Sequence, residues 1–197
     1  MYSLRCASAL FFVHIVGLSV IASPSSQSDT KPSVAEIFEK HVYAWFPDNT
    51  VRRLSPAPGF FVQPCVDPEG KGAVFWGGAE GRPRIWFHDF AENTTRPITP
   101  KDVGSIGPSF DWQGQRIVFA SDAAASTHLD LLTITGAAKT REGYEAQLNL
   151  FVVDVDGTNM RQITHGRFRD SRPAFSPDGK SVAFLSNRGG GKAMGLF

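Results

Sequence analysis

The chain has 197 residues, little cysteine, a formal net charge of only +1 and no sequence of the form Gly-x-Ser-x-Gly. Of the two cysteines, Cys6 lies in the N-terminal leader, so Cys65 has no partner for a disulfide within the rest of the chain. Its neighbours Pro64 and Val66 favour a buried thiol over a reactive one. Without a Gly-x-Ser-x-Gly elbow, this sequence holds no α/β-hydrolase nucleophile. Without a basic cluster, it also lacks the charge pattern typical of nucleic-acid binding.

Metal-ligand patterns are equally scarce. The histidines outside the N-terminal leader are His41, His88, His128 and His165. Their spacing does not match that of metal ligands, so we expect them to be ordinary histidines in loops. The turn "DVDGTN" offers oxygens from Asp154, Asp156 and Asn159, which is compatible with calcium. The distal glutamate of a calcium loop is missing, however, and a hairpin turn explains Gly157 as well. We therefore expect neither a metal nor a cofactor.

The N-terminus resembles an export signal. Arg5 precedes an apolar stretch from about residue 7 to residue 22, and Val20 and Ala22 suit the −3 and −1 positions of a cleavage site. We predict a signal peptide over 1–22, cut after Ala22, and a secreted or periplasmic protein with a short linker at 23–41. An uncleaved anchor is the alternative, although the run falls short of the roughly 20 residues that span a bilayer. Removal of Arg5 leaves 19 basic and 19 acidic residues.

A repeated pattern surrounds three glycines, Gly70, Gly114 and Gly179. The third copy contains the turn Ser176-Pro177-Asp178-Gly179, in which proline, aspartate and glycine each favour a turn and the glycine takes a positive φ. Six residues before each glycine stands a proline: Pro64, Pro108 and Pro173. Five residues after each stands a phenylalanine: Phe75, Phe119 and Phe184. Sixteen residues before each stands an aliphatic residue followed by a hydroxyl residue: Leu54-Ser55, Ile98-Thr99 and Ile163-Thr164.

Each copy reads as four short strands separated by turns. In the third copy these are "LFVVD", "RQIT", "RPAF" and "SVAFLS", in chain order. The first two glycines are 44 residues apart, which fits a four-stranded propeller blade of about 40–45 residues. The second and third are 65 apart, and we place the extra 21 residues in an inserted loop at about 123–148.

The segment 149–190 resembles the TolB-type β-propeller repeat, a relative of the WD repeat. The resemblance rests on Asp154, Asp156, Gly157, Asn159, the run 161–164, Asp170, Pro173, Phe175, the run 176–180, Phe184, Ser186 and Asn187. It implies an all-β fold, in which 42–197 forms a partial β-propeller of four-stranded antiparallel blades. The innermost strand of each blade would carry the Pro-x-Phe segment. Two complete blades would cover 63–99 and 107–164, between an outer-strand piece at 42–55 and an unfinished blade from 172. The blades would form an open arc, without the α/β domain of TolB.

The inserted loop and the loops between blades are expected on one face, where propellers usually bind. The loops between blades are "PAPGFF", "KDVGSIG" and "HGRFRD". The candidate partner-binding residues are His128, Asp130, Arg141, Glu142 and Tyr144 in the insert, and His165, Arg167, Arg169 and Asp170 in the neighbouring loop. A solvated loop without a partner is the competing interpretation.

The sequence therefore favours an exported, non-catalytic module that binds a protein, rather than an enzyme. Alternatives are the propeller part of a prolyl oligopeptidase-like serine peptidase, or a sugar-active propeller whose catalytic part lies outside this sequence. We expect no nucleic-acid partner, no stable membrane span after signal cleavage, and self-association through exposed blade faces. Asn93 begins a glycosylation sequon on a turn, which matters only in a eukaryotic source.

Overall fold

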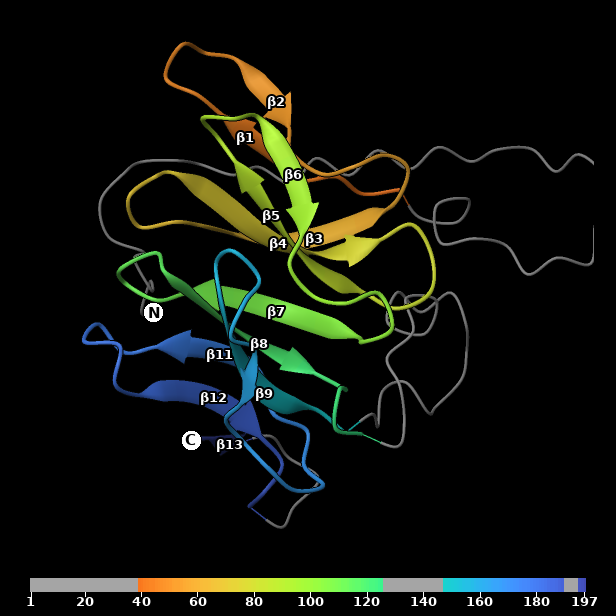
Figure 1. Cartoon of the computed structure of the whole chain (residues 1–197), viewed down its shortest axis with the longest axis vertical. Coiled ribbons are helices and arrows are strands. Elements are labelled where there is room, and N and C mark those ends of the chain that lie inside the picture. The colour runs from red at the N-terminus through yellow and green to blue at the C-terminus, as the bar shows by residue number, and fades with distance from the viewer. Residues whose placement is uncertain (1–38, 126–146, 190–194) are drawn as a thin grey trace, which may run out of the picture.

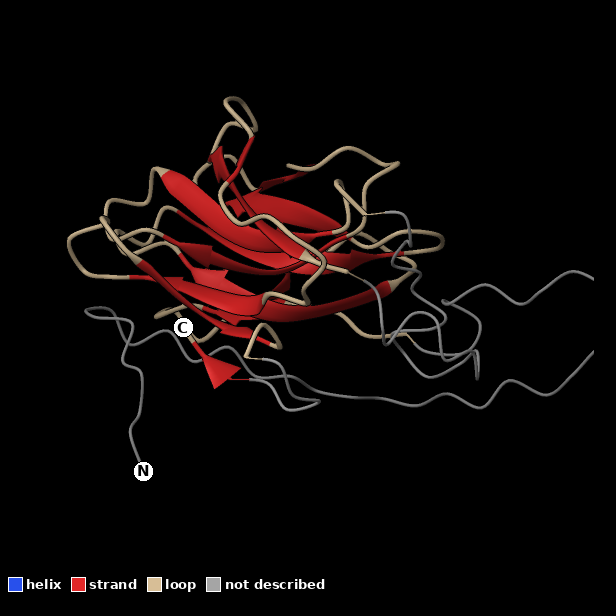
Figure 2. Ribbon diagram, turned by 90° about the horizontal axis from the view of Figure 1, so that it is seen from below, coloured by secondary structure: helices blue, strands red, loops and turns tan. Residues whose placement is uncertain are grey.

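The computed structural model describes residues 39–125, 147–189 and 195–197. The expected signal peptide, most of the linker and most of the inserted loop lie outside these residues. The described chain consists of strands and turns (Figure 2), and none of its elements is a helix long and apolar enough to cross a bilayer. The expected all-β class is confirmed.

Two four-stranded antiparallel sheets form the centre of the molecule (Figure 1), each with its strands in chain order. The first blade consists of β3 (Phe60–Val66), β4 (Gly72–Gly78), β5 (Arg84–Asp89) and β6 (Thr94–Pro97). The second consists of β7 (Ser105–Phe110), β8 (Arg116–Ser121), β9 (Asn149–Asp154) and β10 (Arg161–Gln162). The first strands approach one another, because β7 contacts both β3 and β11. This agrees with an innermost position for the Pro-x-Phe strands.

Incomplete blades lie at the two ends of the molecule. At one end, β1 (Tyr43–Trp45) and β2 (Val51–Arg53) form a two-stranded sheet. At the other, β11 (Ser171–Phe175), β12 (Val182–Ser186) and β13 (Gly195–Leu196) form a three-stranded sheet. Figure 1 shows these pieces on opposite sides of the two complete blades. The expected open arc of two complete and two incomplete blades is confirmed.

The three repeat glycines share one backbone conformation. The φ angles of Gly70, Gly114 and Gly179 are +74°, +66° and +68°, in the left-handed region that disfavours other residues. In the third turn, the Asp178 carboxylate accepts hydrogen bonds from Ser176 Oγ at 2.6 Å and from the Lys180 N–H at 3.1 Å. These contacts lower the pKa of Asp178, the Ser176 bond most strongly. The shared turn predicted from the sequence is confirmed.

The aliphatic–hydroxyl pairs form a repeated corner between the third and fourth strands of each unit. A hydroxyl oxygen accepts a hydrogen bond from an N–H within one residue of the start of the third strand: Ser55 from Val42 at 3.1 Å, Thr99 from Ile85 at 3.0 Å, and Thr164 from Leu150 at 2.8 Å. The aliphatic N–H donates to the carbonyl of the same three residues at 2.7–2.8 Å. The corner shows that β1 and β2 are equivalent to the third and fourth strands of a blade.

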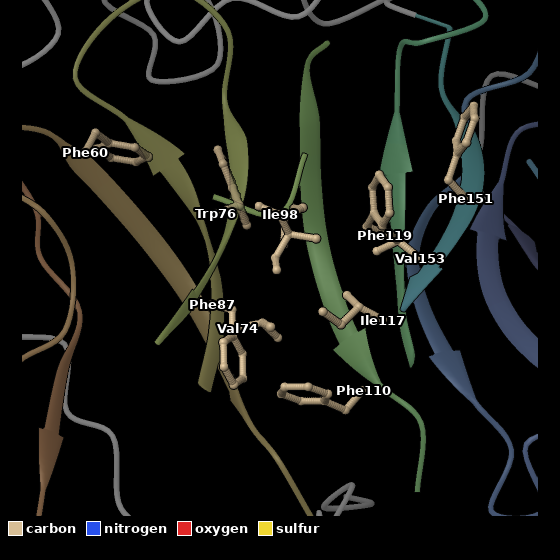
Figure 3. Packing of buried hydrophobic residues seen from close by; sticks show 11 residues of the cluster. Phe60, Val74, Trp76, Phe87, Ile98, Phe110, Ile117, Phe119, Phe151 and Val153 are labelled. Atoms are coloured by element: carbon tan, nitrogen blue, oxygen red, sulfur yellow. The ribbon is translucent and has the colours of Figure 1, made fainter. Parts of the chain in front are cut away.

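Adjacent units pack through three equivalent hydrophobic clusters. Ile85 and Ile98 of the first blade share a cluster with Ile117 and Phe119 of the second (Figure 3). At the preceding junction the corresponding residues are Val42, Leu54, Ala73 and Phe75, and at the following junction they are Leu150, Ile163, Val182 and Phe184. Cys65 is half-buried against the cluster between the first and second blades. Burial of apolar area at each junction, worth about 25 cal/mol per Å², therefore holds the arc together.

Two loop boundaries predicted from the sequence are wrong. Phe60 and Phe61, expected in the loop "PAPGFF", begin β3 and are 9% and 2% exposed. Their strand pairs with Gly77 and Gly78, and any side chain at Gly77 would overlap the Phe60 carbonyl. The loop "KDVGSIG" likewise ends before Ser105, where β7 begins.

Candidate functional site

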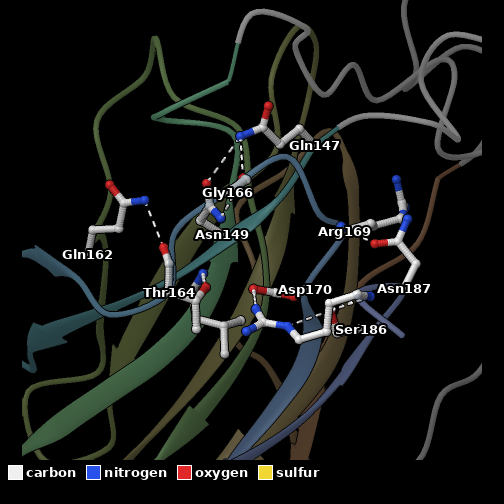
Figure 4. Close-up of polar contacts among 11 residues, drawn as sticks. Gln147, Asn149, Gln162, Thr164, Gly166, Arg169, Asp170, Ser186 and Asn187 are labelled. Atoms are coloured by element: carbon white, nitrogen blue, oxygen red, sulfur yellow. Dashed lines mark hydrogen bonds and ion pairs between the residues drawn. The ribbon is translucent and has the colours of Figure 1, made fainter. Parts of the chain in front are cut away.

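The candidate site is the loop at residues 165–170, between β10 and β11, with the strand ends around it (Figure 4). The loop is attached to the second blade at Gly166, whose carbonyl accepts a hydrogen bond from Gln147 Nε2 at 2.7 Å and a weaker one from Asn149 Nδ2 at 3.3 Å. Gln147 lies near the end of the inserted segment, so this described part of the segment contacts the loop.

The loop is also fixed to the third, unfinished blade. The Arg169 N–H donates to Asn187 Oδ1 at 2.9 Å. The second blade has the same contact one repeat earlier, where the Gly104 N–H donates to Asp122 Oδ1 at 2.8 Å. A side-chain oxygen after the second strand therefore holds the loop that leads into the first strand.

Asp170 is the buried anchor of the loop. Its carboxylate is 0% exposed, and Oδ2 accepts a hydrogen bond from Arg188 Nη2 at 2.6 Å. Arg188 Nε also donates to Ser186 Oγ at 3.0 Å, and its guanidinium lies 4.9 Å from the Phe184 ring centre and 5.2 Å from that of Phe168. Arg188 thus balances the charge of Asp170 and orients the end of the loop.

The other oxygen of Asp170, Oδ1, is buried and accepts no hydrogen bond from the residues that the structure describes. A buried acceptor without a donor costs about 1–3 kcal/mol. A single half-satisfied carboxylate beneath a loop does not make a ligand site, and the described residues bring together no group of three potential metal ligands.

The side chains that reach solvent from this loop are basic. His165 and Arg167 are exposed, and Arg172, two residues after Asp170, is exposed at the start of β11. Because Arg188 neutralises the only carboxylate of the loop, this surface carries a local positive charge.

Basic residues also lie at the corresponding end of the first blade. Arg82 bonds the Asp102 carbonyl and lies 3.9 Å from the buried carboxylate of Asp122. The Arg84 guanidinium donates two hydrogen bonds to the Thr99 carbonyl at 2.6 and 2.8 Å. Burial lowers the pKa of Arg84 and Asp102 opposes this shift, but an arginine remains protonated at neutral pH.

The candidate residues of the loop differ in burial. His165 and Arg167 lie at the surface, Arg169 is half-buried, and Asp170 lies beneath the surface. The five candidates in the insert, at positions 128, 130, 141, 142 and 144, lie outside the described residues.

A repeated β-bulge on the innermost strands was missed. Gln63, Gly107 and Arg172 each precede an anchor proline and take φ angles of +52°, +64° and +50°. The register of the first strand against the second shifts at the same place in all three units. Only the glycine at 107 signalled a positive φ. Arg172, at the third bulge, is exposed and lies two residues after the end of the candidate loop.

Comparisons with known proteins agree with this architecture. No protein-family model matches the chain. The chain is 26% identical over 152 residues to a TolB homologue of Chlorobium luteolum, covering 77% of this chain and 30% of the relative. A second match, 44% identical over 46 residues, is to dipeptidyl-peptidase 5 of Porphyromonas gingivalis, covering 23% of this chain and 7% of that protein.

Solved structures show the same fold. TolB from Acinetobacter baumannii superimposes with a TM-score of 0.57 at 18% identity, covering 80% of this chain and 34% of that one. Puromycin hydrolase also gives a TM-score of 0.57, at 16% identity, covering 84% of this chain and 25% of that one. The chain thus spans about 30% of the length of the TolB homologue it matches. Together with the repeat and the blades, these similarities support a β-propeller of the TolB type for this chain.

Proposed function

We propose that the protein is a non-catalytic, exported module that binds another protein through the loop at 165–170 and the adjoining insert. The observation that carries this proposal is the loop itself: side chains of the second and third blades hydrogen-bond its backbone at Gly166 and Arg169, while His165 and Arg167 are exposed. A loop that is held in one conformation loses little conformational entropy when a partner binds.

The charge of the loop defines the chemistry of the partner. The basic side chains at 165, 167 and 172 have no exposed acidic residue between them, since Asp170 is buried and paired with Arg188. An acidic surface on the partner complements this charge, speeds association and makes binding depend on salt. The insert residues His128, Asp130, Arg141, Glu142 and Tyr144 extend the same surface in this proposal.

Export is part of the proposal, because the predicted signal peptide would place the module where the partner must also be. N-terminal sequencing of the mature protein tests it, and a terminus at Ser23 is expected. A terminus at Met1 would contradict cleavage and favour the anchor.

Site-specific photocrosslinking tests the binding surface. A photoreactive amino acid at Arg167, introduced in the native host, is expected to form a covalent adduct with a protein. The matched control is Thr158, which is exposed in the β9–β10 turn at the opposite end of the strands. Arg167→Glu should weaken the adduct formed from a second probe at His165. Equal labelling at positions 167 and 158, or none at 167, would show that the loop is not the binding surface.

A second candidate function is the propeller part of a serine peptidase. It is favoured by the 44% identity to dipeptidyl-peptidase 5 and by the fold shared with puromycin hydrolase. The test is to read the genomic sequence beyond the last codon and to label the protein expressed from its native locus with a fluorophosphonate probe. A Gly-x-Ser-x-Gly segment together with covalent labelling would establish the peptidase; further blades without labelling would support the binding module.

A further inference from the structure

The junction between the β1–β2 pair and the first blade contains a buried histidine where the next junction has a valine. The corner at Ile85 matches the corner at Leu150, so His88 of β5 is equivalent to Val153 of β9. These two side chains are 3% and 0% exposed, and Val153 lies in the apolar cluster between the complete blades (Figure 3). The repeat therefore provides an apolar reference for the histidine.

The histidine takes part in a polar relay between two units of the arc. The Thr95 hydroxyl donates a hydrogen bond at 2.7 Å to the carbonyl of Leu54, across the junction, and lies 2.8 Å from Nδ1 of His88. Because a hydroxyl has one proton to donate, Thr95 must accept the second bond from Nδ1. The neutral ring therefore carries its proton on Nδ1, and Nε2 is the nitrogen that gains a proton in acid.

The next junction has no such relay at the equivalent place. Thr95 stands three residues before Ile98, the aliphatic residue of its corner, and Met160 stands three residues before Ile163. The pair formed by the histidine and Thr95 thus corresponds to Val153 and Met160, neither of which can titrate. Of these two junctions, only the one with the β1–β2 pair can respond to protons at this position.

Protonation of His88 places a charge where few groups stabilise it. The bond from Nδ1 is the only hydrogen bond of the ring to the described residues, and the Phe90 ring centre lies 5.6 Å away. The residues opposite His88 in the sheet, Ala73 of β4 and Thr95 of β6, are uncharged. Burial lowers the pKa of His88, and the carboxylate of the adjacent Asp89 opposes this shift only in part.

The titratable groups of the preceding unit have other partners or another orientation. The Arg52 guanidinium lies over an aromatic ring of its own strand pair, 4.4 Å from the ring centre. Tyr43 and Arg53 are opposite each other on the face of the pair that is turned away from the first blade. His41, the other histidine of the junction, bonds Glu39 through Nε2 at 2.8 Å, so it has a partner for its second nitrogen and serves as a control.

We infer that this junction is an acid-sensitive joint: protonation of His88 releases the β1–β2 pair from the first blade, while the junction between the two complete blades stays closed. A two-stranded sheet without a packing partner is only marginally stable in water. Release of the pair therefore also opens the hydrogen bonds between β1 and β2, which makes the event measurable at their amides.

Amide hydrogen exchange of the full chain at two equivalent residues tests the joint. The N–H of Leu54 donates to Val42 at 2.8 Å, and the N–H of Ile98 donates to Ile85 at 2.7 Å. Protection factors correct for the direct effect of pH on exchange. Between pH 7.5 and 5.5 that of Leu54 should fall by up to about tenfold, the limit for a histidine that regains a pKa of about 6.5 on release. That of Ile98 should not change.

Two substitutions copied from the second blade distinguish the histidines. His88→Val introduces the residue of the next junction and should abolish the fall at Leu54. His41→Asn introduces the residue found at the equivalent Asn149 and should preserve it. An equal fall at Leu54 and Ile98, or a fall that persists in His88→Val, would overturn the inference.

A nitrogen NMR spectrum of the unsubstituted chain tests the relay without a variant. The imidazole of His88 should be the Nδ1–H tautomer at pH 7.5, as the bond to Thr95 requires. An Nε2–H tautomer would contradict the relay. A ring that is fully protonated at pH 5.5 while the protection of Leu54 is undiminished would contradict the joint.

Discussion

Gly114 lies in the turn of the second blade and packs against the turn of the first. Comparing its replacement by alanine with the same replacement at Gly81 separates backbone strain from a steric clash. The residue has a φ of +66°, and a Cβ placed on it would overlap Asp67 Oδ1 of the preceding blade. Gly81 has almost the same φ, +67°, but no atom within 4 Å of its Cβ position. Gly81→Ala therefore measures the backbone strain alone, and Gly114→Ala measures that strain together with the displacement of Asp67.

The expected magnitudes follow from these contacts. A left-handed alanine costs about 1–2 kcal/mol. The Asp67 carboxylate, which is 5% exposed, accepts hydrogen bonds from the Lys71 N–H at 2.9 Å and the Glu69 N–H at 3.3 Å. Weakening of these bonds adds roughly 1–2 kcal/mol. We expect a loss of about 3 kcal/mol in the free energy of unfolding for Gly114→Ala and of about 1–2 kcal/mol for Gly81→Ala.

Urea denaturation of both variants provides the measurement. The second substitution Asp67→Ser introduces the residue type found at Ser176 in the third turn, where the serine hydroxyl accepts a hydrogen bond from the Ser181 N–H at 2.9 Å. Because serine is also shorter than aspartate, this substitution should recover part of the loss in the Gly114→Ala background. Equal losses for the two alanine variants would refute the contact between neighbouring turns.

Three further predictions concern buried polar residues. Burial lowers the pKa of His88, so the unfolded chain, in which a histidine has a pKa of about 6.5, binds a proton more readily than the folded chain. The contribution of His88 to stability should therefore be complete above that pH and fall below it. His88→Val should remove this part of the pH dependence in denaturation curves at about pH 7.5 and 5.5. Thr99→Val leaves the buried Ile85 N–H without its acceptor and should lower the free energy of unfolding by about 1–3 kcal/mol; an unchanged denaturation midpoint would contradict the corner. Asp170→Ala removes the partner of Arg188 and should cost about 2–4 kcal/mol, measured the same way, and a neutral result would show that the pair does not hold the loop.

Strands and turns were predictable because the repeat fixes their positions independently of local propensity. The turn at Gly179 contains strong turn residues, and the same spacing located the weaker turns at Gly70 and Gly114. The spacing alone also placed the aliphatic–hydroxyl corner, although the hydrogen bond that explains it, such as that from Ile85 to Thr99, appears only in the structure.

The features that sequence reasoning missed depend on contacts distant in the chain. The bulges at Gln63 and Arg172 place residues without a left-handed preference at positive φ, because the sheet register requires it. The candidate loop at 165–170 was predicted as a unit, but its division into an exposed Arg167 and a buried Asp170 depends on Arg188, which lies after the next two strands.

The most direct test of the account is amide hydrogen exchange at the three blade junctions. The N–H groups of Phe61, Ser105 and Asp170 each donate to a carbonyl of the preceding unit, of Lys40, Pro83 and Leu148, at 2.8–2.9 Å. If these junctions are equivalent and hold the arc together, all three amides should exchange slowly, with similar opening free energies. Rapid exchange at Ser105, between the two complete blades, would contradict the packed propeller arc.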